Sequence, residues 1–176
     1  MLRPSDRQSD EYVNRKGQVI MPGPDGSFFD RRGAFVICRT GNRVLSIKAI
    51  DGEGLWELPG GGVDEGESPE KAVLRETREE TGFDLSPKYL QHLHSQKAYL
   101  HVAGRGFWNY EQDFFLIDDP ALVDHLFDGV KTSPEDGEMV WVHIDEMQDL
   151  RYKHFVDRAL RILNFIEAQD KVKNVY

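Results

Sequence analysis

A glycine-rich loop that leads into an acidic helix constrains this chain more than any other feature of its sequence. The loop, residues 59–62, contains three consecutive glycines, so its backbone can approach a ligand without side chains in the way. Ser68 and Pro69 are residue types that begin a helix, at the N-cap and at the first helical position. Gly82 is a residue type that ends one. The sequence therefore predicts a helix over residues 69–81, directly after a loop suited to ligand binding.

Three carboxylates share one face of this predicted helix. At about 100° per residue, Glu80 lies about 40° to one side of Glu76 and Glu79 about 60° to the other. Like charges this close repel, and they lie toward the helix C-terminus, where the dipole makes negative charge less favourable. A hard divalent cation such as Mg²⁺ would resolve this conflict. The alternative is an ordinary solvated face, which is how most clusters of Glu on a helix are explained.

The spacing around the helix resembles a known pattern, the Nudix box, at every fixed position over residues 61–83. Its fixed residues here are Gly61, Glu67, Arg75, Glu76, Glu79, Glu80 and Gly82. Residues 56–61 also resemble the family's approach to the box. The resemblance implies an α/β fold, the Nudix-type α/β/α sandwich with a mixed β-sheet. It also implies a hydrolase that acts on acid anhydrides in phosphorus-containing compounds, cleaving a diphosphate linkage in a nucleoside diphosphate-X by metal-activated water.

The resemblance also assigns roles to residues of the box. The implied ligands for Mg²⁺ or Mn²⁺ are the carbonyl of Gly60 and the carboxylates of Glu67, Glu76, Glu79 and Glu80. Arg75 matches the residue that orients these carboxylates, so it counts with Glu76 and Glu79 among the expected catalytic residues.

A general base would help to deprotonate the attacking water. In the family this base is often a glutamate outside the box, on a later loop or strand. Glu138 and Glu111 are the candidates in this sequence, and Glu135 is a weaker third. For each of them the alternative is an exposed surface acid.

Substrate choice has to come from residues outside the box. Tyr99 lies where hydrolases of dinucleoside polyphosphates often carry a tyrosine. Residues 104–110 combine glycines with Arg105, Trp108 and Tyr110, so this loop could stack a base and pair a cation with phosphate. The alternative for these aromatic residues is packing in the sheet or core. The X group stays open between a nucleotide sugar, a nucleoside triphosphate and a dinucleoside polyphosphate.

Patterning along the rest of the chain predicts strands interspersed with helices. The expected strands cover residues 34–38, 44–50, 56–58, 89–100, 110–117 and 138–144, with a hairpin turn at 40–42 and one further short strand at 18–21. Helices are expected from Asp119-Pro120 to near Gly129 and over residues 153–168. We expect an N-terminal extension over residues 1–32, the catalytic domain over 33–170 and a tail over 171–176.

Composition excludes some function classes. The formal charge of −9 argues against general nucleic-acid binding but not against a small nucleotide substrate. No apolar run is long enough to span a bilayer, and the polar N-terminus is unlike a secretory signal. The single cysteine, Cys38, cannot form an intramolecular disulfide, so we expect a cytoplasmic protein. A homodimer is expected from the resemblance alone.

Two other functions compete with hydrolysis. A Nudix-like module could bind or sense a nucleotide without catalysis, although non-catalytic relatives usually lose a box carboxylate and none is missing here. Isopentenyl diphosphate isomerase shares the fold, but its chemistry relies on a cysteine motif and Cys38 lies in an apolar run. His92 and His94 form a close pair that would share one face of a strand, but we expect no cysteine or carboxylate beside them to complete a zinc site, and therefore structural or surface roles for both.

Overall fold

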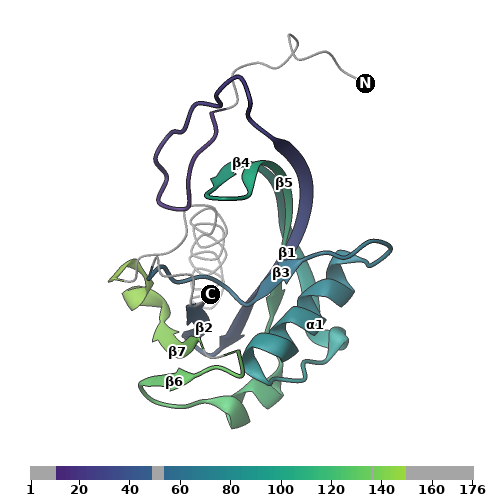
Figure 1. Ribbon diagram of the computed structural model, residues 1–176. Coiled ribbons are helices and arrows are strands. Elements are labelled where there is room, and N and C mark those ends of the chain that lie inside the picture. The colour runs from purple at the N-terminus through teal and green to yellow at the C-terminus, as the bar shows by residue number, and fades with distance from the viewer. Residues whose placement is uncertain (1–10, 49–53, 136, 150–176) are drawn as a thin grey trace, which may run out of the picture.

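A mixed β-sheet forms the centre of the molecule (Figure 1). The computed structural model describes residues 11–48, 54–135 and 137–149. In the sheet the strands follow the order β4-β5-β1-β2-β7-β6, and β3 pairs with β1 beside this path. The strands are β1 (Phe28–Thr40), β2 (Arg43–Lys48), β3 (Gly60–Gly62), β4 (Leu90–Val102), β5 (Gly106–Ile117), β6 (Val130–Thr132) and β7 (Glu138–His143).

The long central strand β1 has different neighbours along its length. It runs parallel to β5 from Phe28 to Cys38 and antiparallel to β3 from Gly33 to Phe35. Its last residues pair antiparallel with β2, which confirms the hairpin at residues 40–42. One parallel pairing among antiparallel ones confirms the expected mixed sheet. The pairing with β3 brings the glycine-rich loop to the middle of β1.

Helix α1 (Pro69–Thr81) confirms the prediction from its capping residues. The Ser68 hydroxyl accepts a hydrogen bond from the backbone N–H of Lys71 (3.4 Å). Gly82 adopts a left-handed conformation (φ 76°) and donates its N–H to the carbonyl of Arg78. One face of α1 is buried against the sheet through Ala72, Val73, Thr77 and Thr81.

Two apolar clusters pack on opposite faces of the sheet. Along β1, Ala34, Val36 and Cys38 lie in the cluster that includes the buried residues of α1, whereas Phe35 and Ile37 lie in the other. This alternation follows from the two-residue period of a strand. We call these the α1 face and the opposite face. Tyr110, Phe114 and Leu116 of β5 belong to the opposite face.

Several expected elements differ from the observed ones. Residues 18–21 form no strand, only an isolated bridge between Val13 and Val19. Residues 56–58 contribute a bridge from Glu57 to Ile47, and the short strand follows them as β3. Glycines have little preference for strands, but the edge of β1 at this level is not paired with β2 and supplies the pairing partner.

Other differences concern helices. The segment after Asp119 is a 3-10 helix, η3 (Pro120–His125), which ends before Gly129. Its first turn is capped because the Asp119 carboxylate accepts the N–H of Ala121 (2.9 Å). Two further 3-10 helices, η2 (Pro87–Tyr89) and η4 (Ile144–Asp149), were not expected. The predicted helix over residues 153–168 lies outside the described residues. In the described part of the chain, no helix is both long and apolar enough to cross a membrane.

The N-terminal segment packs against the hairpin of β4 and β5 rather than standing apart from the domain (Figure 1). Val13 donates its N–H to the carbonyl of Tyr99 and accepts the N–H of His101, both at 2.9 Å. Tyr12 is buried and its hydroxyl donates to Asn109 (2.7 Å). Residues of the expected N-terminal extension therefore pack against β4 and β5.

Candidate functional site

The glycine-rich loop and helix α1 meet at close range. A Cβ atom at Gly61 would lie 2.7 Å from the carboxylate of Glu76, so any other residue there would displace this carboxylate. Gly60 has a φ of +136°, which side chains rarely adopt, and a Cβ there would collide with the backbone of Ala34. Its N–H donates to the carboxylate of Glu80 (2.8 Å). The loop therefore fits closely over the acidic face of α1.

Arg75 forms hydrogen bonds with several groups of the box. Its guanidinium donates two hydrogen bonds to the carboxylate of Glu67, at 3.1 and 2.9 Å. It also donates to Glu76 (2.8 Å), to Glu79 (3.2 Å) and to the carbonyl of Gly62 (3.0 Å). A planar group with five donors suits this role, and lysine could not replace it. Arg75 thus fixes the rotamers of three carboxylates at once.

The carboxylates of the box differ in their ionisation. The hydrogen bonds from Arg75 lower the pKa of Glu67. Burial raises the pKa of Glu76, although Arg75 partly offsets the rise. Burial raises the pKa of Glu80 to about 9, and the charges of neighbouring carboxylates add to the rise. Acids held partly out of water without enough positive charge are a typical feature of functional sites.

The charges of two glutamates outside the box contribute to these raised pKa values. The charges of Glu57 and Glu135 contribute to the raised pKa of Glu80, and that of Glu135 also contributes for Glu76. Glu57 is almost fully buried (7% exposed) and its backbone is paired to Ile47. Sequence reasoning missed Glu57, although a charged residue between the apolar Trp56 and Leu58 was a usable signal.

The other two candidate bases have different surroundings. Glu138 begins β7 and forms an ion pair with Lys48. Glu111 lies on the α1 face of β5, where it forms ion pairs with Lys97 (3.3 Å) and Arg32 (4.0 Å). Of the three candidates, only Glu135 acts on the ionisation of both Glu76 and Glu80.

The expected substrate residues fall into two groups. Tyr110 is buried on the opposite face, with its hydroxyl directly over Gly33. Gly33 pairs with Gly62 of β3, so this hydroxyl lies beside the box. Trp108 packs edge-on to Tyr110, with 5.9 Å between the ring centroids. The structure thus brings these two residues to the side of the box.

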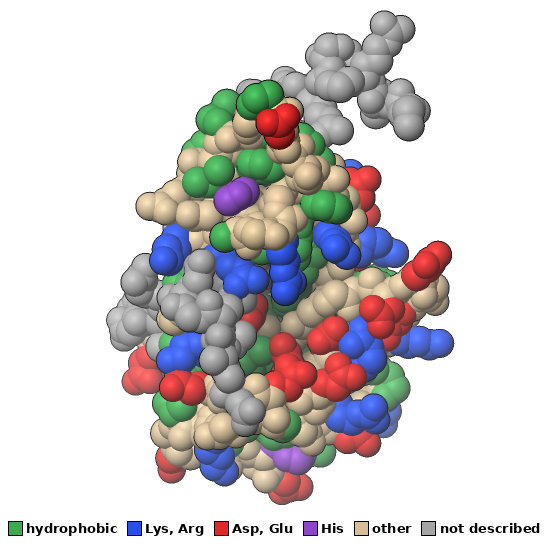
Figure 2. Space-filling model, viewed as in Figure 1, with side chains coloured by type: hydrophobic (Ala, Val, Ile, Leu, Met, Phe, Trp, Pro, Cys, Tyr) green, Lys and Arg blue, Asp and Glu red, His purple; other side chains and the backbone are tan. Residues whose placement is uncertain are grey.

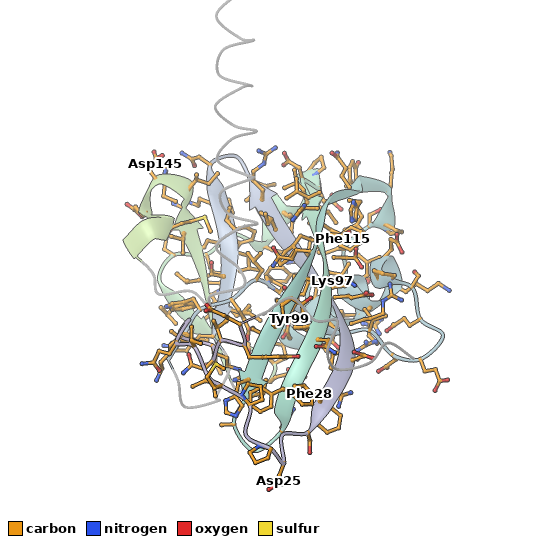
Figure 3. All side chains as sticks on the ribbon, turned by 90° about the horizontal axis from the view of Figure 1, so that it is seen from above. Asp25, Phe28, Lys97, Tyr99, Phe115 and Asp145 are labelled. Carbon is orange, nitrogen blue, oxygen red and sulfur yellow. The ribbon has the colours of Figure 1, made fainter. Side chains whose placement is uncertain are left out.

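Tyr99 and Arg105 lie farther away. The ring of Tyr99 packs edge-on to Tyr12, and Figure 3 shows Tyr99 toward the same end of the sheet as Phe28. Arg105 occupies the turn between β4 and β5. Because Gln112 is level with Gly33, the seven residues from Arg105 to Gln112 put that turn about 23 Å along the strand from the box. The structure does not bring Arg105 to the carboxylates.

Strand pairing also changes the surroundings of the histidine pair. The expectation that His92 has no carboxylate beside it was wrong, because Asp113 on β5 lies 3.4 Å from its Nε2. Ser95 lies between them, at 2.9 Å from His92, and donates to Asp113 (2.6 Å). This is a hydrogen-bonded surface cluster, and the carboxylate was missed because it is distant in sequence.

The donor set of the box fits a hard divalent cation. Figure 2 shows Asp and Glu side chains gathered over α1 and the loop before it. The Gly61 backbone leaves room for the Glu76 carboxylate, and the Gly60 backbone lies against Glu80. In the described ranges no three His, Cys, Asp or Glu side chains already converge as a metal site. The oxygens of these carboxylates accept hydrogen bonds from Arg75 and from the Gly60 N–H.

Comparison with known proteins agrees with this geometry. The model of the NUDIX domain matches residues 29–162. An RNA pyrophosphohydrolase of Shewanella sediminis is 38% identical over 76 residues, which are 43% of this chain and 42% of that protein. An RNA pyrophosphohydrolase of Aeromonas hydrophila subsp. hydrophila is 30% identical over 127 residues, covering 67% of this chain and 72% of that protein.

A solved structure has the same fold. The crystal structure of a MutT NUDIX hydrolase from Burkholderia pseudomallei has a TM-score of 0.57 and 27% identity, covering 76% of this chain and 97% of that one. The chain spans less than half the length of the Shewanella relative that it matches. The Nudix-type fold expected from the sequence is confirmed. The domain match, the fold and the complete box together show that this chain belongs to the NUDIX domain family.

Proposed function

We propose that this chain is a metal-dependent diphosphatase that hydrolyses a diphosphate linkage in a nucleoside diphosphate-X. The observation that carries the proposal is the fit of the Gly60–Gly62 strand over the carboxylates of Glu76 and Glu80, with Arg75 holding the neighbouring acids. The relatives named as RNA pyrophosphohydrolases support this chemistry, since they too are named for cleavage of a diphosphate.

The cation would be Mg²⁺ or Mn²⁺, held by Glu76, Glu79 and Glu80 with the Gly60 carbonyl, and with Glu67 in support. When bound, such a cation neutralises charge on the phosphate oxygens and makes a water molecule more acidic. The raised pKa of Glu80 fits this role because a cation at that place replaces its proton.

The protein's own residues supply positioning and proton transfer. Arg75 keeps Glu76 and Glu79 in fixed rotamers, so the carboxylates need little rearrangement. We assign the general base to Glu135, because its charge acts on both Glu76 and Glu80. It takes one proton from the attacking water, whose oxygen bonds to phosphorus while the bridging oxygen leaves with its electron pair. Glu138, paired with Lys48, is the matched comparison.

A panel assay tests this function. The purified chain is incubated with Mg²⁺ and a nucleotide sugar, a nucleoside triphosphate or a dinucleoside polyphosphate in ¹⁸O-labelled water, and products are separated by anion exchange. We expect cleavage of at least one class, one labelled phosphate in the products, and no cleavage after EDTA treatment. Glu135→Gln should slow turnover about a hundredfold and Glu138→Gln much less. Tight nucleotide binding without turnover on the whole panel would instead favour the non-catalytic binding module.

A further inference from the structure

Two glycines lie side by side next to the box and leave a bare patch of backbone. Gly33 of β1 pairs directly with Gly62 of β3. Residues paired in this way across an antiparallel ladder turn their side-chain positions to the same face. For Gly33 this is the opposite face, because Phe35, two residues along β1, lies there. We call Gly33 and Gly62 the glycine floor, since a ligand on this face would meet only their main-chain atoms.

The two halves of the glycine floor differ in what covers them. The Tyr110 hydroxyl occupies the place that a Cβ atom of Gly33 would take. At Gly62, a Cβ atom would have none of the described residues within 4 Å. Space therefore remains over Gly62, and the Tyr110 hydroxyl borders this space from the neighbouring strand.

The ring of Tyr110 is held in place by its neighbours. It packs edge-on to Phe35, with 6.3 Å between the ring centroids, and to Trp108, with 5.9 Å. All three belong to the buried or partly buried side chains of the opposite face. A side chain already held on two sides loses little entropy when its hydroxyl binds a ligand. The Tyr110 hydroxyl is thus a fixed polar group at the border of the glycine floor.

A buried amide lies on the other side of Gly33. Gln112 pairs with Gly33 through the parallel register of β1 and β5, and its side chain is only 1% exposed. Its Oε1 accepts a hydrogen bond from Gln96 of β4 (2.8 Å), whereas its Nε2 has no hydrogen-bond partner in the part of the chain that the structure describes. Exchanging the amide O and N would only change which atom lacks a partner. An unpaired buried amide costs about 1–3 kcal/mol, so its presence beside the floor indicates a role other than packing.

The position of the glycine floor selects the part of a nucleotide that can reach it. Gly62 directly follows Gly61, whose backbone lies against the Glu76 carboxylate, and its carbonyl accepts a hydrogen bond from Arg75 (3.0 Å). The space over Gly62 is therefore one residue away from the acids that would hold the diphosphate. In a nucleotide the sugar is attached directly to the phosphate chain, and the base lies beyond it. A sugar also suits this place chemically, because its ring can lie on main-chain atoms while its hydroxyl groups find polar partners.

We propose that the glycine floor holds the ribose next to the cleaved diphosphate, with the Tyr110 hydroxyl hydrogen-bonded to one hydroxyl group of this sugar. The assignment rests on the proposed function and deepens it, because it makes the ribose hydroxyls a determinant of substrate choice. A site built to hydrogen-bond a substrate hydroxyl discriminates against the analogue that lacks it, since the polar group of the site is then left unpaired.

Sugar analogues test the hydrogen bond. Values of kcat/KM with Mg²⁺ are compared for the best nucleotide of the panel and its 2′-deoxy and 3′-deoxy analogues, in wild type, Tyr110→Phe and Tyr89→Phe. We expect wild type to lose about tenfold or more when one of the two hydroxyls is removed, and Tyr110→Phe to treat all three compounds within about twofold of one another. Tyr89→Phe removes a hydroxyl beside the cluster of the α1 face and should keep the wild-type ratios. Equal use of the three compounds by wild type, or undiminished discrimination in Tyr110→Phe, would overturn the proposal.

A binding measurement separates the sugar site from the proposed function. ATP and inorganic tripolyphosphate, which has the phosphates without the sugar, are each titrated with Mg²⁺ by calorimetry into Glu79→Gln and into the same variant carrying Gly62→Val. We expect Gly62→Val, which fills the space over the floor, to weaken ATP binding about tenfold and to change tripolyphosphate binding less than about twofold. If wild-type protein cleaves no nucleotide but this difference is found, the proposed function fails and the sugar site stands. If ATP binds no more tightly than tripolyphosphate, or if Gly62→Val affects both ligands equally, the sugar site fails whatever the turnover shows.

Discussion

Replacing Glu80 with glutamine should stabilise the metal-free protein. Burial raises the pKa of Glu80 to about 9 from its ordinary value of 4.5, so the folded state keeps a proton that the unfolded state releases. The free energy of unfolding that this proton contributes is fully present below pH 4.5 and is lost as pH rises toward 9. At pH 7 the difference corresponds to about 3 kcal/mol, which water around the half-buried side chain reduces to about 2 kcal/mol. Glutamine has no proton to lose and can still accept the Gly60 N–H.

The assay is urea unfolding in EDTA at pH 5 and at pH 7, followed by circular dichroism. We expect Glu80→Gln to be about 2 kcal/mol more stable than wild type at pH 7 and nearly equal to it at pH 5. Glu70→Gln, in the exposed first turn of α1, is the control and should change stability by less than about 1 kcal/mol at either pH.

Addition of Mg²⁺ completes this experiment. The cation should stabilise wild type, and more so at the higher pH, because binding displaces a proton from Glu80. Glu80→Gln should gain much less. If the variant is no more stable than wild type at pH 7 in EDTA, burial does not disfavour the ionised form of Glu80 as the structure indicates. That result would refute the prediction.

Three other predictions concern the box and the core. Arg75→Lys keeps the charge but loses the multidentate geometry, so kcat should fall tenfold or more in steady-state assays while circular dichroism shows a folded protein. Gly61→Ala places a Cβ against the Glu76 carboxylate and should weaken Mg²⁺ binding about tenfold by calorimetry; Gly62→Ala, where nothing lies within 4 Å, is its control. Burial raises the pKa of Cys38 well above its usual range, so its thiol should react with a disulfide reagent at neutral pH only after denaturation, and rapid labelling of the native protein would contradict the buried placement.

The helix of the box was predictable because its signals are local. Ser68 and Gly82 cap it as their residue types indicate, and a period of 3.6 residues puts the acids on one face. The short strand β3 was not predictable from its own residues, since three glycines form a strand only because the middle of β1 is there to pair with them.

Features that depend on long-range pairing were missed or left open. The parallel register between β1 and β5 places the Tyr110 hydroxyl over Gly33 and turns Glu111 to the other face. No pattern within either strand specifies that register. Likewise, residues near Val13 are polar and rich in turn formers, so their docking on β4 depends on an edge supplied by a distant segment.

Turnover in one pair of variants examines the metal-dependent reaction most directly. Cleavage of the best nucleotide of the panel is measured against Mg²⁺ concentration for wild type, Glu79→Gln and Glu70→Gln, all on the same helix. We predict that Glu79→Gln lowers kcat about a hundredfold or more, whereas Glu70→Gln stays within about twofold of wild type. Unchanged Mg²⁺-dependent turnover in Glu79→Gln would contradict catalysis at the acidic face of α1.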